Sequence, residues 1–98
     1  MNKKYTDMLG VLQRVAPMTT RGGNKAAEQY LIVYEKGVIY QSYSSIIAVR
    51  SGGNIILGCD WNRSITTMKY LQAVVRGSKK DIQKKIDQGL IIYDEELI

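Results

Sequence analysis

The chain has 98 residues, of which 45% are hydrophobic and 23% are charged, and its formal net charge is +5. This length and composition predict a single globular domain, residues 1–98, that needs no disulfide or structural metal to fold. Because the chain contains one cysteine and no histidine, we expect no metal site, no cofactor and no enzymatic activity.

No stretch of the sequence is long and apolar enough to span a membrane, and no apolar signal core follows the basic N-terminal residues. A single cysteine also suits a reducing compartment. We therefore expect a cytoplasmic protein, in which Cys59 is a buried structural thiol.

The N-terminal quarter combines a helical pattern with a loop. Apolar residues at helical spacing predict a helix over Thr6–Val15, although Gly10 falls inside it. Met18–Lys25 has the composition of a loop. Its segment Arg21–Lys25 could hold a phosphate, but a flexible connector is the simpler interpretation.

The next part of the chain predicts an antiparallel meander of four strands. Gln29–Glu35 and Val38–Tyr43 are rich in Tyr, Ile and Val, and the short turn between them predicts a hairpin. Ser45–Arg50 continues the sheet, and Ile55–Leu57 follows a second glycine turn.

Beyond this meander the apolar spacing becomes helical. Ser64 is the expected N-cap of a first helix that ends near Gly77. One stripe of this helix is expected to face the sheet. The residues of the stripe are Ile65, Met68, Leu71, Val74 and Val75.

A second helix is expected to begin at Ser78, with Asp81 completing a capping box, and to end at Gly89. Leu90–Tyr93 is a candidate fifth strand, and Asp94–Glu96 is expected to be a solvated tail. The expected fold is therefore α+β, an antiparallel sheet of four to five strands with an N-terminal helix and a C-terminal helical hairpin packed on it.

Two motifs resemble a family of short phage- and plasmid-encoded proteins of unknown function. They are the aromatic-Gln-Ser-Tyr strand within Tyr40–Ala48 and the Trp-x-x-Ser-x-Thr-Thr-x-Lys-Tyr-Leu segment Trp61–Leu71. The resemblance covers roughly residues 24–92 and implies a mobile-element origin, a bacterial host cytoplasm and an α+β layout. It implies no activity, and Val74–Arg76 departs from the more hydrophobic helix ending of that family.

The strongest functional feature is a basic segment within the predicted helices. It contains seven cations against Asp81 alone, a formal charge of +6, whereas the whole chain carries +5. Such clustering is typical of surfaces that bind a phosphate backbone, although a solvated helix face is the plainer alternative. The cations are Arg63, Lys69, Arg76, Lys79, Lys80, Lys84 and Lys85.

Tyrosines form a second candidate feature, because the chain has seven of them and no phenylalanine. Tyr40 and Tyr43 lie in the predicted hairpin, where exposed rings could stack on nucleobases or anchor a protein interface. The plainer alternative is that they cover the sheet, since aromatic residues favour strands in general.

These features lead to two functional hypotheses. The first is a non-catalytic accessory protein that binds nucleic acid through the basic segment, with Tyr40 and Tyr43 as stacking groups. The second is a protein-binding inhibitor of a host defence or nucleic-acid-handling complex, similar in role to an anti-CRISPR protein or another anti-defence effector. The expected partner is thus nucleic acid or a host protein that handles it, not a membrane, and homodimer formation stays open.

Overall fold

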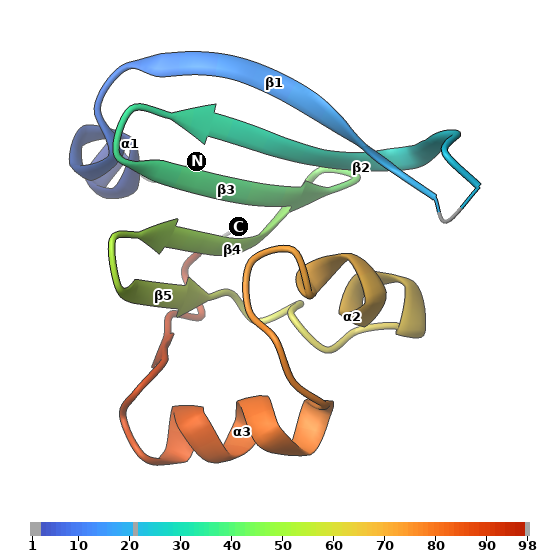
Figure 1. Cartoon of the computed structure of the whole chain (residues 1–98). Helices are drawn as coiled ribbons and strands as arrows, with labels where there is room; N and C mark the ends of the chain where they lie inside the picture. The colour runs from blue at the N-terminus through green and yellow to red at the C-terminus, as the bar shows by residue number, and fades with distance from the viewer. Residues whose placement is uncertain (1–2, 21, 98) are drawn as a thin grey trace.

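A computed structural model describes residues 3–20 and 22–97 (Figure 1). The described strands form one sheet in the order β1-β2-β3-β4-β5-β6, antiparallel except for the parallel pair β5–β6. The elements are α1 (Lys3–Leu9), β1 (Leu12–Thr19), β2 (Lys25–Tyr34), β3 (Gly37–Ser42), β4 (Ser45–Ser51), β5 (Asn54–Leu57), α2 (Ile65–Leu71), α3 (Lys79–Asp87) and β6 (Ile92–Tyr93).

The α+β class and the predicted meander are confirmed, since β2 to β5 pair in sequence order as antiparallel strands. The number and direction of the strands were only partly predicted, because the sheet is mixed and has six strands. The expected strand Leu90–Tyr93 is shortened to β6, Ile92–Tyr93. It pairs in parallel with β5 because α2 and α3 form the long crossover that parallel neighbours require.

The predicted helix Thr6–Val15 is wrong beyond Leu9. Gly10 has a φ of +81° and its amide donates to the Thr6 carbonyl at 3.2 Å, which closes α1. The chain then enters β1, because pairing with β2 satisfies its backbone groups. β1 is an edge strand, where Pro17 is tolerated.

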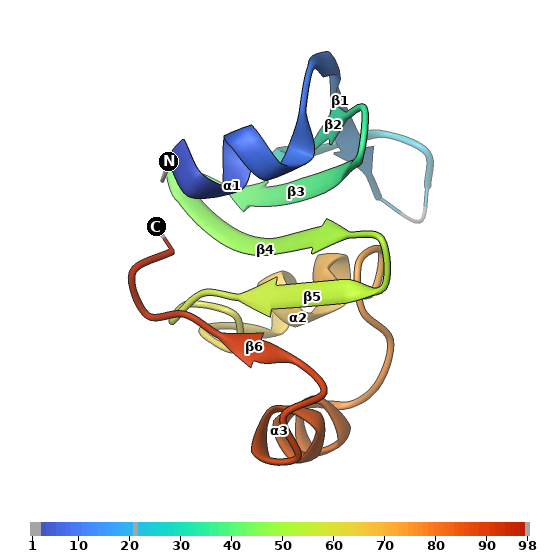
Figure 2. The same cartoon turned by 90° about the vertical axis from the view of Figure 1, so that its left-hand side faces the viewer.

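One face of the sheet is covered by α1 and by the last residues of the chain. Leu9 of α1 and Leu97 pack with the sheet residues Ile39 and Val49 in a buried cluster. Figure 2 shows α1 in front of the sheet and α2 behind it. α1 and the segment that ends at Leu97 thus stabilise the same face.

The acidic segment Asp94–Glu96 is not simply the solvated tail that the sequence predicts. The Tyr5 hydroxyl donates to Asp94 Oδ2 at 2.5 Å, and the Asp94 amide donates to the Leu57 carbonyl at 2.9 Å. The pKa of Tyr5 is raised to about 12, mainly by burial and secondly by the hydrogen bond to Asp94. Asp94 therefore ties the chain end to both α1 and the sheet.

The other face is covered by α2, and α3 lies beyond the β6 edge of the sheet (Figures 1 and 2). Leu71 and Val74 pack with Tyr40 and Leu57 of the sheet, and Ile82 of α3 joins the same cluster. The expected core stripe is thus confirmed for Met68, Leu71, Val74 and Val75, although Val74 and Val75 lie beyond the end of α2. The prediction that Ile65 faces the sheet is wrong, because this residue lies at the first turn of α2 with 90% of its surface exposed.

Both predicted helix starts are confirmed by their caps. The Thr67 amide donates to Ser64 Oγ at 3.0 Å at the start of α2. In α3 the Asp81 amide donates to Ser78 Oγ at 3.2 Å, and the Ser78 amide donates to Asp81 Oδ2 at 3.1 Å. α2 ends at Leu71, not near Gly77 as predicted, and a turn connects it to α3.

Candidate binding surface on the C-terminal helices

The net charge of the chain is concentrated in the two C-terminal helices and their connection. Residues 63–88 contain seven cations and two acids, a formal charge of +5, and the whole chain has the same net charge. The rest of the chain is therefore neutral as a whole. The attraction of the protein for anions is therefore expected to be strongest at this part of the molecule.

The exposed side of α3 carries three of the predicted cations, Lys79, Lys80 and Lys84, which we call the basic face. Ile82 is buried on the side of the helix opposite Lys80 and Lys84, so the core fixes the orientation of these two lysines. Gln83 Nε2 donates to Asp87 Oδ1 at 3.1 Å within the same face.

Arg76, Lys84 and Lys85 meet at a shallow hollow of about 320 Å³ where α3 lies against the connection from α2. Asp81 also lines this hollow. The hydrogen bonds from Ser78 lower the pKa of Asp81, and Lys85 and Lys84 lower it further. Asp81 therefore stays ionised and offsets one of these cations.

Arg63 is not part of this cluster. Its guanidinium donates to Ser42 O at 3.1 Å, to Ser42 Oγ at 2.9 Å and to Ser45 Oγ at 3.1 Å, and it forms an ion pair with Asp60 at 3.5 Å. These bonds hold the β3–β4 turn against the segment that precedes α2. The arginine expected to bind phosphate is thus engaged within the protein.

The expectation that Tyr40 stacks on a nucleobase does not agree with its position. Tyr40 is 0% exposed, and its hydroxyl donates to Gln29 Oε1 at 2.6 Å. Burial raises its pKa. Tyr43 is 55% exposed, but it lies in the β3–β4 turn, which both views show well away from α3 (Figures 1 and 2).

Removing the Tyr40 hydroxyl tests this buried pair. We expect Tyr40→Phe to lower the free energy of unfolding by about 1–3 kcal/mol, because Gln29 would lose its donor inside the protein. Urea unfolding followed by circular dichroism measures the change. The exposed Tyr43→Phe is the control and should change stability by no more than about 0.5 kcal/mol. Equal stability of both variants would contradict the buried pair.

A groove of about 610 Å³ separates the start of α2 from the start of α3, and we call it the interhelix groove. Its shape is held by Gln72, whose Nε2 donates to Gly77 O at 2.9 Å and whose Oε1 accepts from the Gly77 amide at 3.0 Å. The groove is lined by Asn62, Ser64, Ile65, Met68, Lys69, Gln72, Gly77, Ser78 and Lys79.

The sequence did not indicate this groove. Ile65 was assigned to the core stripe, and nothing in the sequence distinguishes Gln72 from an ordinary surface glutamine. The exposure of Ile65 could have been inferred from its position, because it directly follows the N-cap Ser64, at the first turn of the helix. A side chain at that position extends past the end of the helix and need not reach the sheet.

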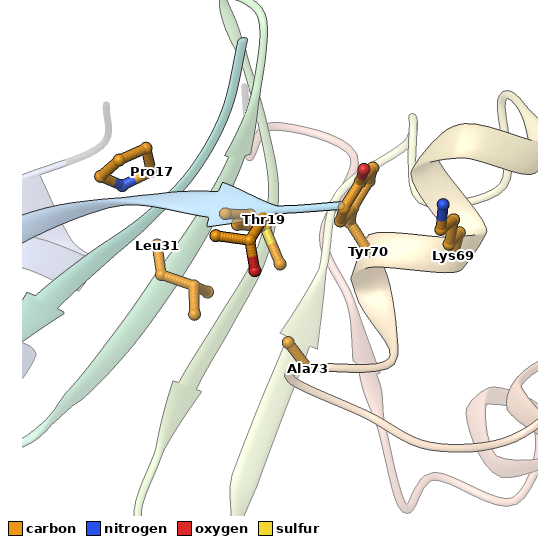
Figure 3. Close-up of a pocket in the computed structure, with 7 residues that line it drawn as sticks. Pro17, Thr19, Leu31, Lys69, Tyr70 and Ala73 are labelled. Atoms are coloured by element: carbon orange, nitrogen blue, oxygen red, sulfur yellow. The ribbon is translucent and has the colours of Figure 1, made fainter. Parts of the chain in front are cut away.

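A smaller hollow of about 420 Å³ lies between the end of β1 and α2. Figure 3 shows Pro17, Thr19 and Leu31 on the strand side and Tyr70, Lys69 and Ala73 on the α2 side. The Lys69 ammonium lies 5.3 Å from the centre of the Tyr70 ring, a cation–π contact. The polar side chains that line the hollow are Thr19, Lys69 and Tyr70.

Within the described part of the chain, the remaining candidate residues, Cys59 and the β1–β2 connection, do not form a site. Cys59 is exposed, which corrects the expectation of a buried thiol. The Thr20 amide donates to Asn24 O at 2.7 Å in the tight connection between β1 and β2, and Arg21 lies outside the described residues. Over 3–20 and 22–97, no three His, Cys, Asp or Glu side chains gather where they could hold a metal ion. No helix in these ranges has the length and apolar character needed to cross a membrane.

The model of a family of unknown function, DUF8033, matches residues 13–89. This match runs from β1 to just beyond α3, so it includes the basic face and the interhelix groove. No curated protein and no solved structure matches the chain significantly. The family match agrees with the resemblance to a family without an assigned activity, and the chain therefore belongs to DUF8033.

Proposed function

We propose that this protein is a non-catalytic accessory protein that binds nucleic acid through the basic face and the neighbouring residues Arg76 and Lys85. The supporting observation is that five cations gather around α3 against two acids, Asp81 and Asp87; the cations are Arg76, Lys79, Lys80, Lys84 and Lys85. A phosphate backbone binds to such a surface by releasing its condensed counterions. Consistent with the mobile-element resemblance, the proposed place of action is the cytoplasm of a bacterial host.

The side chains on this surface favour contact with the backbone rather than with the bases. Lysines are flexible point charges that suit phosphate oxygens, and bidentate reading of guanine is usually done by arginine. Tyr40 is buried, and Tyr43 lies on another part of the molecule. The proposed binding is therefore insensitive to nucleotide sequence.

The second candidate function is the protein-binding inhibitor of a host defence or nucleic-acid-handling complex. The specific observation in its favour is the interhelix groove, because an apolar groove beside cations suits a protein surface better than a phosphate backbone. In that case the basic face would steer the protein toward an acidic patch of its partner.

Salt dependence tests the proposal. For the wild type, we expect the logarithm of the affinity to fall with the logarithm of salt concentration by about 0.9 per neutralised phosphate on duplex DNA and about 0.7 on single strands. Changing both Lys80→Gln and Lys84→Gln should flatten the slope by roughly one to two units and weaken all sequences alike. Fluorescence anisotropy with labelled oligonucleotides measures both quantities.

The matched control removes the same charge elsewhere. The pair Lys25→Gln and Lys36→Gln changes exposed lysines at the start of β2 and in the β2–β3 connection, and its slope should equal that of the wild type. Absence of any complex with duplex or single strands at about 150 mM salt, where charges are screened beyond about 8 Å, would contradict the proposal. The inhibitor function would then be preferred.

A further inference from the structure

The interhelix groove has an apolar wall that no side chain of the described structure fully covers. Ile65 is 90% exposed, and Met68, one turn further along α2, lies on the core and also lines the groove. A single exposed apolar residue is ordinary on a protein surface. Ile65 differs because it stands at the rim of a concave surface that Met68 continues.

The groove is preformed. Ser64 caps α2 on one side, Ser78 caps α3 on the other, and Gln72 ties the connection through both atoms of its amide. A partner would therefore meet a fixed shape and would not need to order this connection first. Such preorganisation reduces the entropic cost of binding.

The charges at the groove have one sign. Lys69 of α2 and Lys79 of α3 line it from opposite sides, and no acidic side chain is among its lining residues. We propose that the interhelix groove binds an acidic segment of a partner protein. The segment inserts a large apolar side chain against Ile65 and Met68, and its carboxylates face Lys69 and Lys79.

A nucleic acid fits this groove less well than an acidic protein segment does. The groove lining contains neither an aromatic side chain on which a base could stack nor an arginine that could bind a phosphate through two hydrogen bonds. The side chains of its apolar wall also offer no charge and no hydrogen-bond donor to a phosphate backbone. The inference goes beyond the proposed nucleic-acid binding: the basic face shares Lys79 with the groove, whereas Lys80 and Lys84 lie outside the groove.

A second copy of the same chain is also a poor occupant. The acidic segment of the chain is Asp94–Glu96, followed by Leu97. Asp94 is held by Tyr5, and Leu97 is 1% exposed within the cluster under α1. The chain would have to release its own end before that segment could reach another copy.

A display library of short random peptides, selected on the full-length protein, tests the proposal. Binders that also bind the Ile65→Ser variant are removed at each round. We expect the enriched peptides to share a Leu, Met or Phe flanked by Asp or Glu. An enriched peptide, made synthetically, should bind Ile65→Ser roughly tenfold or more weakly than wild type. Replacing both Lys69 and Lys79 with Gln should mainly slow its association, most strongly at low salt.

Matched controls separate the groove from the rest of the surface. Val11→Ser removes another exposed β-branched side chain, at the far edge of the sheet, and should leave peptide affinity unchanged. Because Ile65 is so exposed, its serine variant should unfold at the same urea concentration as wild type. Oligonucleotide binding should depend on Lys80 and Lys84 and remain unchanged in Ile65→Ser, so a failure of one proposal does not imply a failure of the other.

Three results would overturn the inference. The first is a selection that yields no peptides specific for the wild type, or yields peptides without acidic residues. The second is a parallel loss of oligonucleotide binding in Ile65→Ser, which would assign the groove to nucleic acid. The third is a concentration-dependent dimer, seen by analytical ultracentrifugation, that Ile65→Ser abolishes, because a second copy would then be the occupant.

Discussion

The variant Gly37→Ala is expected to lower the free energy of unfolding by about 3 kcal/mol or more. A Cβ at position 37 would lie 2.0 Å from the Arg50 carbonyl oxygen and 2.7 Å from Leu9 Cδ2. The oxygen belongs to the backbone of β4, and Leu9 is fully buried, so neither can move without disturbing the sheet or α1. The substitution therefore pushes β4 and α1 away from β3 where the three elements meet.

Gly53→Ala is the control for this prediction. Gly53 lies in the β4–β5 turn, has no heavy atom within 4 Å of its Cβ position and does not have a positive φ. Its replacement should be neutral or stabilise the fold by up to about 1 kcal/mol, because alanine restricts the unfolded chain. Urea unfolding of both variants measures the difference. If Gly37→Ala is as stable as Gly53→Ala, the close approach of β3 to β4 is wrong.

Truncation of Leu71 should have the second large effect. Leu71 is 0% exposed and lies in the cluster that joins α2, α3 and the sheet, so Leu71→Ala leaves a cavity that rigid neighbours cannot fill. We expect a loss of about 2–5 kcal/mol in the free energy of unfolding. Denaturant unfolding with an unchanged slope measures it, because an altered slope would indicate a change in the compactness of the unfolded state.

Ile65→Ala on the same helix provides the comparison. Ile65 is 90% exposed, so its truncation should change stability by no more than about 0.5 kcal/mol. The two variants together test which side of α2 faces the sheet. Similar losses for both would mean that the helix is rotated from the orientation described above.

The parts of the fold that the sequence predicted are those determined by local signals. The β2–β5 meander follows from strands rich in β-branched and aromatic residues with glycine turns between them. The helix starts at Ser64 and Ser78 follow from side-chain caps that act within a few residues. Each of these signals acts over a short distance along the chain, so tertiary contacts had little to change.

β1 could not be predicted in this way. Met8, Leu9, Leu12 and Val15 fit one face of a helix, and only the backbone pairing with β2 makes the second half of this segment a strand. The positive φ at Gly10 marks the change, but glycine in the sequence allows either outcome. The direction of β6 likewise depends on where the crossover through α2 and α3 ends.

The candidate site was predictable in its charge but not in its shape. The cations near α3 follow from composition, because lysine side chains remain at the surface wherever the helix packs. Burial of Tyr40, the internal bonds of Arg63 and the exposure of Ile65 all depend on partners distant in the sequence. The interhelix groove exists only once Gln72 has fixed the connection between the helices.

The position of Pro17 in β1 has a consequence for aggregation. β1 is an open edge of the sheet and exposes apolar side chains at Leu12 and Val15, an arrangement that favours the addition of further strands and fibril growth. The nitrogen of Pro17 carries no hydrogen, so a strand approaching this edge cannot form an uninterrupted ladder along it. The proline thereby hinders this apolar edge of the sheet from templating the growth of insoluble assemblies.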